Sequence, residues 1–202
     1  MEENALQALT HAVVSRLFIE IEASGRHVHV TKEQAKALFG HSLTPKRPLS
    51  QPGQFLAQER LTVIGPKGEF QGVAVLGPER KEAQVEISLT DAKHLGVTPP
   101  IRQSGEVENT PGITLLGPLG RVELTRGLMV AKRHIHLSPK EGENFGVRDG
   151  QIVRFQTYTN RPCILEDMVV RIHPNFAAAV HIDYDEANAI GFQPGDLGRI
   201  LK

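Results

Sequence analysis

Residues 61–87 read LTVIGPKGEFQGVAVLGPERKEAQVEI, in which three short runs rich in apolar and β-branched residues are separated by Gly-Pro turns. The runs cover residues 61–64, 70–76 and 83–87. Short runs of this kind between glycine and proline indicate β-strands, because these two residues favour turns. None is long enough for three helical turns, so the stretch predicts successive strands rather than strands alternating with helices.

The same pattern extends in both directions along the chain. Residues 18–23 alternate in polarity, which is typical of a strand with one buried face. The 19 glycines and 13 prolines place turns between the runs. We therefore expect a mainly β fold of two small β-barrel domains with short capping α-helices. Further strand-like runs occupy residues 113–116, 121–124, 128–131, 152–156 and 168–172.

Helical signals are few. Leu6, Leu9, Val13 and Leu17 lie at helical spacing, which predicts an amphipathic N-terminal extension over residues 1–17.

Three short helices are also expected. Thr31 and Gln34 fit a capping box before a helix that reaches residue 39, and Thr90 is expected to cap a second helix. A third should cover residues 183–190 and end at Gly191.

Composition excludes several classes of protein. The 202 residues contain 23 Lys and Arg against 23 Asp and Glu, so no basic footprint for nucleic acid or a polybasic membrane contact is present. No apolar run approaches the roughly 20 residues of a spanning helix, and no signal-peptide pattern opens the chain. We expect a cytoplasmic protein without nucleic-acid or membrane partners. The single cysteine, Cys163, leaves histidines and carboxylates as metal ligands.

One motif occurs twice. Arg26-His27-Val28-His29 and Arg133-His134-Ile135-His136 are each followed by a Ser or Thr that can cap a helix, and His134 follows His27 by 107 positions. The simplest interpretation is two barrel-like halves.

Each repeat suits a metal ion. Alternate side chains on a strand share one face about 7 Å apart, so both imidazoles of an H-x-H motif can reach one ion. Imidazole is a favoured ligand of zinc. The alternative is a duplicated motif with a purely structural role. Spacing alone does not choose further ligands among His41, His94, His173, His181, Glu86, Asp183 and Asp185.

Arg80 follows a Gly-Pro turn and can bind an anionic oxygen pair through its planar guanidinium. The alternative is a surface ion pair with Glu79 or Glu82. Glu86 lies on a strand between apolar neighbours, where it either faces a site or forms the polar side of the strand.

Taken together, the motifs of the chain resemble those of the PduL-type phosphotransacylases, also called phosphate propanoyltransferases. The resemblance runs from about residue 18 to the end and rests on RHVH at 26–29, GPER at 77–80, VEIS at 85–88, PPIRQSG at 99–105, RHIH at 133–136 and HIDYDEANA at 181–189.

The resemblance implies an enzyme that interconverts a short-chain acyl-CoA, propanoyl-CoA or acetyl-CoA, and phosphate with acyl phosphate and CoA. It implies two zinc ions per chain, lying between two β-barrels. The first ion would be held by His27, His29 and Glu86, and the second by His134, His136 and His181. Arg80 would bind phosphate, and Ser24 and Asn188 would line the CoA site.

The resemblance also implies that the chain crosses between barrels. Residues 18–25 and 132–202 would form one barrel and residues 26–131 the other. Members of the family often serve bacterial microcompartments, so the extension at 1–17 is expected to bind shell or lumen proteins there, unless it packs on its own barrel. We further expect a homodimer. The alternative function is a non-catalytic β-barrel binding module whose metals are structural.

Overall fold

The computed structural model describes residues 7, 10 and 13–202 and is mainly β. The chain forms two compact units. The larger unit comprises Ser24–Lys132 and Asp183–Asp185; the smaller unit comprises the described residues up to Ala23, with Arg133–Ile182 and Glu186–Lys202. The mainly β prediction is confirmed.

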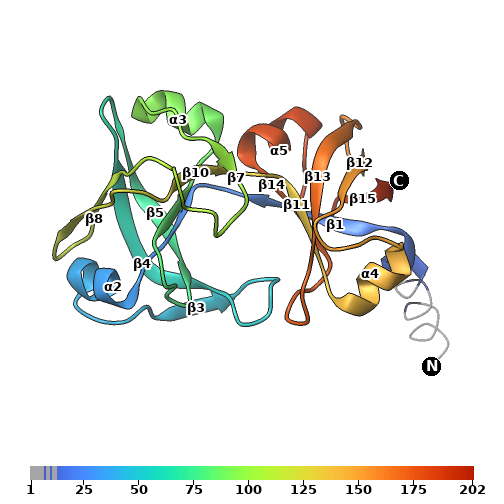
Figure 1. Ribbon diagram of the computed structural model, residues 1–202, viewed down its shortest axis with the longest axis horizontal. Coiled ribbons are helices and arrows are strands. Elements are labelled where there is room, and N and C mark those ends of the chain that lie inside the picture. The colour runs from blue at the N-terminus through green and yellow to red at the C-terminus, as the bar shows by residue number, and fades with distance from the viewer. Residues whose placement is uncertain (1–6, 8–9, 11–12) are drawn as a thin grey trace. The chain divides into compact units, whose positions relative to one another are not determined.

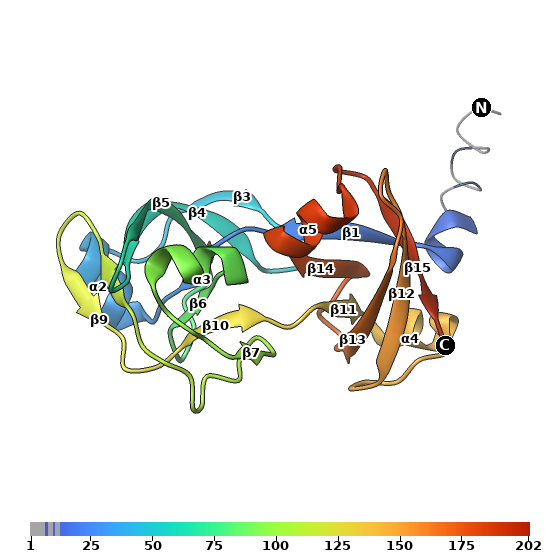
Figure 2. The same ribbon diagram turned by 90° about the horizontal axis from the view of Figure 1, so that it is seen from above.

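The smaller unit is a closed six-stranded barrel in the order β1-β14-β11-β13-β12-β15. Antiparallel pairing of β1 with β15 closes it, and Figure 2 shows β12, β13 and β15 side by side. Its core is filled by side chains such as Phe155, Ile135 and Met168, which exclude water almost completely. The strands are β1 (Ile19–Ser24), β11 (His134–Leu137), β12 (Ile152–Tyr158), β13 (Ile164–Ile172), β14 (Ala179–Asp183) and β15 (Leu197–Leu201), and the helices α4 (Pro139–Phe145) and α5 (Tyr184–Ile190).

The larger unit is a nine-stranded sheet curled into a half-barrel, ordered β7-β10-β6-β2-β5-β4-β8-β9 with β3 paired to β4. Figure 1 shows its long antiparallel pair, β4 and β5. Val28, Val75 and Val85 lie in the core, completely buried. The elements are β2 (His27–His29), α2 (Lys32–Phe39), β3 (Pro45–Pro48), β4 (Phe55–Ile64), β5 (Glu69–Gly77), β6 (Gln84–Glu86), α3 (Leu89–Leu95), β7 (Ile101–Arg102), β8 (Thr114–Leu116), β9 (Arg121–Glu123) and β10 (Leu128–Ala131).

Helices α2, α3 and α4 all begin at a capping box and end at a glycine in the left-handed conformation. The box predicted at Thr31 and Gln34 is confirmed. The predicted cap of α3 at Thr90 is wrong. Ser88 caps α3 together with Asp91, and the backbone N–H of Thr90 instead donates to the Asp185 carboxylate at 2.8 Å.

The prediction for residues 1–17 lies partly outside the described residues. Gln7, Thr10 and residues 13–17 are helical. Among the residues that the structure describes, no helix has the length and apolar character needed to cross a membrane.

Candidate metal centres

The first candidate centre combines His27 and His29 of β2 with Glu86, the last residue of β6. Antiparallel pairing sets His27 opposite Glu86, so that the two side chains meet on one face. His29 projects to the same face two residues later. The ligand atoms of the three side chains lie within 4.8 Å of one another, and all three residues are at least nine-tenths buried.

The backbone fixes the protonation of both imidazoles in this centre. Nδ1–H of His27 donates to the carbonyl of Gly25 at 2.8 Å, and Nδ1–H of His29 donates to the carbonyl of Leu76 at 3.2 Å. A carbonyl only accepts, so Nδ1 carries the proton and Nε2 of a neutral ring keeps its lone pair. Orientation of a ligand histidine through its second nitrogen is typical of metal sites.

The pKa values of the three ligand groups are shifted in different directions by their surroundings. Burial lowers the pKa of His29, and the nearby Arg80 and His27 charges lower it further, to well below its usual value. Burial also lowers the pKa of His27, but the Glu86 carboxylate outweighs that effect and the net shift is upward. Burial raises the pKa of Glu86, yet the surrounding positive groups, His27 first, hold it well below its usual value. The centre therefore contains an ionised carboxylate and a neutral His29 at neutral pH.

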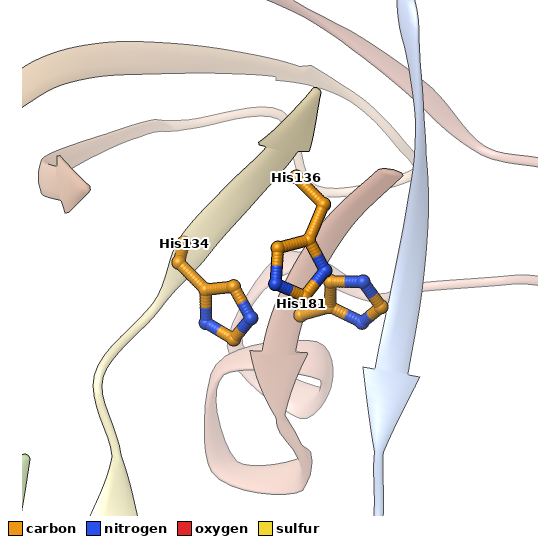
Figure 3. A group of neighbouring side chains, drawn as sticks. All are labelled: His134, His136 and His181. Atoms are coloured by element: carbon orange, nitrogen blue, oxygen red, sulfur yellow. The ribbon is translucent and has the colours of Figure 1, made fainter. Parts of the chain in front are cut away.

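The second candidate centre consists of three histidines in the smaller unit, shown in Figure 3. His134 and His136 lie on one face of β11, and His181 lies directly opposite His134 on β14. Their ring centroids are separated by 4.6 to 5.0 Å, and ligand nitrogens of all three lie within 4.8 Å of one another.

Two described residues, Phe176 and Glu22, lie beside the second centre. The ring of Phe176 packs against His136 with centroids 4.0 Å apart, and Oε2 of Glu22 lies 3.6 Å from Nδ1 of His181. A carboxylate beside a ligand histidine orients its ring and raises its basicity.

Arg80 lies beside the first centre. Its Nη1 donates to the Oγ of Ser104 at 3.3 Å, and the Ser104 hydroxyl donates to Oε1 of Glu86 at 3.0 Å. Among the described residues that line it, Arg80 is the one charged group of a hollow of about 330 Å³; the others are Pro52, Gly53, Gln54, Gly77 and Pro78.

Both carboxylates expected as alternative partners of Arg80 have contacts elsewhere. Glu82 pairs with Arg126, and the Glu79 carboxylate accepts from the backbone N–H of Leu43 at 2.9 Å. Glu86 is buried, so it does not form a solvated side of its strand.

The remaining candidate ligands lie outside both centres. His41 is exposed, and its Nδ1 lies 3.7 Å from Oε1 of Glu59. His94 belongs to α3, where its ring packs on Phe70. His173 packs on Phe176, and Asp183 ends β14. The Asp185 carboxylate accepts from the Ser88 hydroxyl and the Thr90 backbone N–H at the start of α3.

The two residues expected to line a CoA site belong to different units. Ser24 is the last residue of β1 and lies in the larger unit. Asn188 belongs to α5 in the smaller unit, where its side chain is exposed.

Comparison with known proteins gives the family. A model of the phosphate propanoyltransferase family matches residues 20–193. The chain belongs to this family. It is 54% identical over 185 residues to the phosphate propanoyltransferase of Enterococcus faecalis, covering 91% of this chain and 88% of that one. The phosphate propanoyltransferase of Clostridioides difficile is 49% identical over 206 residues, 99% of both chains.

A third relative carries the same name. The phosphate propanoyltransferase of Thermotoga maritima is 48% identical over 187 residues, 91% of this chain and 89% of its own. The names of these relatives support a phosphate acyltransferase, and the resemblance inferred from the motifs is confirmed.

Two residues at the first centre were not among the predicted site residues. Gln84 precedes Glu86 by two positions on β6 and shares its face, so strand alternation was a usable signal for it. Ser104 comes from the loop after β7, and nothing in its local sequence links it to Glu86.

Proposed function

We propose that this chain interconverts a short-chain acyl-CoA and inorganic phosphate with acyl phosphate and CoA, using a zinc ion at each candidate centre. The observation that carries the proposal is the buried His27, His29 and Glu86 group, connected to the Arg80 guanidinium through one serine hydroxyl. This arrangement combines ligands for a cation with a donor for an anion.

The donor sets fit zinc. Two imidazoles with a carboxylate, and three imidazoles, are both typical of catalytic zinc sites, in which three protein ligands leave a coordination position open. His27, His29 and Glu86 would hold one ion, and His134, His136 and His181 the other. When bound, zinc supplies Lewis-acid polarisation of the thioester carbonyl and stabilises the departing thiolate. A purely structural zinc site would instead have four protein ligands.

Arg80 is proposed to hold the phosphate. The phosphate oxygen attacks the thioester carbonyl carbon, so a C–O bond forms while the C–S bond breaks and CoA leaves as the thiolate. The reaction needs no covalent enzyme intermediate, so none is proposed at the exposed Cys163. The Arg80 guanidinium contributes by orienting the anion and by offsetting its lost hydration.

Ser24 and Asn188 are proposed to bind CoA. A hydroxyl and a carboxamide can each donate to and accept from the amides of the pantetheine arm.

Thiol release tests the reaction. Propanoyl-CoA, acetyl-CoA and butanoyl-CoA are each incubated with the protein, with and without phosphate, while free CoA is measured. We expect release that requires phosphate and yields acyl phosphate. Equal release without phosphate would identify a hydrolase, and no release with any of the three would favour a non-catalytic binding module.

The N-terminal extension is proposed to bind microcompartment proteins. Val13 and Leu17, at helical spacing, are 50% and 56% exposed, which leaves apolar surface for a partner. Deletion of residues 2–15 should leave phosphate-dependent CoA release intact and abolish co-sedimentation with assembled shells.

An N-terminal helix that packs on its own barrel predicts the opposite result. Asn144 of α4 donates to the carbonyl of Arg16 at 3.2 Å, so residue 16 is retained in the shortened chain. Loss of activity or a lower melting temperature on deletion, with unchanged shell binding, would show that the extension is structural.

A further inference from the structure

The Glu86 carboxylate is held by a buried hydrogen-bond network. Gln84 is 1% exposed, and its Oε1 accepts from the backbone N–H of Gly105 at 2.8 Å. This contact identifies the other side-chain atom of Gln84 as the amide nitrogen, a donor. That nitrogen donates both to Oγ of Ser104 at 2.8 Å and to Oε1 of Glu86.

The position of the Ser104 hydroxyl proton follows from its neighbours. Oγ of Ser104 accepts from the amide of Gln84 and from the guanidinium of Arg80. Neither partner atom can accept a proton in return. The single hydroxyl proton is therefore donated to Oε1 of Glu86 at 3.0 Å.

The two oxygens of Glu86 thus differ. Oε1 accepts two hydrogen bonds from the protein, one from Gln84 and one from Ser104. Oε2 lies 3.5 Å from Nε2 of His27, which is one of the proposed metal ligands. Lone pairs engaged by two donors make Oε1 the poorer metal ligand.

We propose that Gln84 and Ser104 are positioning residues, which hold Glu86 so that Oε2 alone is presented to a metal ion at the first centre. This inference rests on the proposed metal chemistry. A carboxylate already fixed in one orientation loses little rotamer freedom when an ion binds. The contacts of Gln84 and Ser104 with Glu86 should therefore raise the affinity of the centre for the metal ion. The Ser104 hydroxyl also accepts from Arg80, which places the proposed phosphate donor beside the metal ligand.

Cobalt provides a spectroscopic readout of this geometry. The metal-free full chain is titrated with Co²⁺, and the visible absorption, the affinity and the number of bound ions are measured for wild type, Gln84→Met, Ser104→Ala and Ser104→Thr. We expect about 10-fold to 100-fold weaker binding at one of two ions in Gln84→Met and Ser104→Ala, with an altered spectrum. Ser104→Thr keeps the hydroxyl and should restore both.

A matched control exists on β5. Gln71 donates to Oε1 of Glu69, also two residues away on one strand, but this pair is exposed. Gln71→Met removes the same kind of hydrogen bond away from the centre, so it should change neither affinity nor spectrum. The three histidines of the second centre are intact in every variant and provide an internal reference.

The outcomes separate the two proposals. If the double variant His27→Ala with His29→Ala binds as many ions as wild type, with the same affinity, the first metal centre itself is overturned. If the double histidine variant loses an ion, but Ser104→Ala and Gln84→Met keep the wild-type affinity and spectrum, only the positioning role of Gln84 and Ser104 is overturned. Circular dichroism of the metal-free variants checks folding. If buried Gln84→Met does not fold, the comparison of Ser104→Ala with Ser104→Thr decides, because Ser104 is only half-buried in a loop.

Discussion

Replacement of His134 and His136 together by alanine should remove about one bound metal ion per chain and lower phosphate-dependent CoA release on the order of 10³-fold. The double variant leaves one imidazole, His181, at the second centre, too few ligands to retain zinc against a chelator. The first centre keeps its own ligands in the larger unit, so its ion should remain. Elemental analysis and the thiol assay on the same preparation measure both effects.

Histidines outside the two centres provide the control. His41 is exposed and His94 packs on Phe70 at the surface of α3. His41→Ala with His94→Ala removes the same number of imidazoles and should leave metal content and turnover close to wild type. Full activity in the His134 and His136 double variant, or loss of both ions from it, would contradict independent centres that are both needed for catalysis.

Replacement of Arg80 should produce the second largest effect. Phosphate is small and doubly charged near neutral pH, so its site must replace strong hydration with strong donors. Arg80→Lys keeps the charge but loses the planar pair of donors, so KM for phosphate should rise or kcat should fall. Arg80→Ala should cost a further 1–3 kcal/mol or so, which is about 5-fold to 150-fold in kcat/KM for phosphate.

Affinity for CoA and metal content should change little in the Arg80 variants, because neither is assigned to the guanidinium. Lys81→Ala removes the exposed neighbouring charge and is the matched control. Normal phosphate kinetics in Arg80→Ala would contradict the assignment. A loss of metal from Arg80→Ala would show instead that Arg80 acts through Ser104 and Glu86.

Local patterns predicted much of the fold. The run at 70–76 corresponds to β5 and that at 152–156 to β12, because glycines, prolines and β-branched residues report directly on turns and strands. Strand β3 reads Pro-Lys-Arg-Pro and is exposed throughout, so it carries no alternation that could reveal it. The cap of α3 was misplaced because Ser88 and Thr90 are both good capping residues, and the choice depends on Asp185 from far along the chain.

Part of the candidate site could also be predicted from local sequence, and part could not. The H-x-H pairs could be predicted to share a face because strand geometry is local. The convergence of Glu86 with His27, and of His181 with His134, depends on strand pairing over long separations, and only the resemblance to a family anticipated it. The Ser104 contact with Glu86 depends on a loop from elsewhere in the larger unit, which spacing does not reveal.

The most direct test of a zinc-dependent phosphate acyltransferase is CoA release from propanoyl-CoA as zinc is returned to metal-depleted protein, with and without phosphate. We expect no phosphate-dependent release from the depleted protein and a rate that rises until both centres are filled, at about two zinc ions per chain. Full phosphate-dependent release in the presence of a strong chelator, from protein shown to contain no metal, would contradict the account.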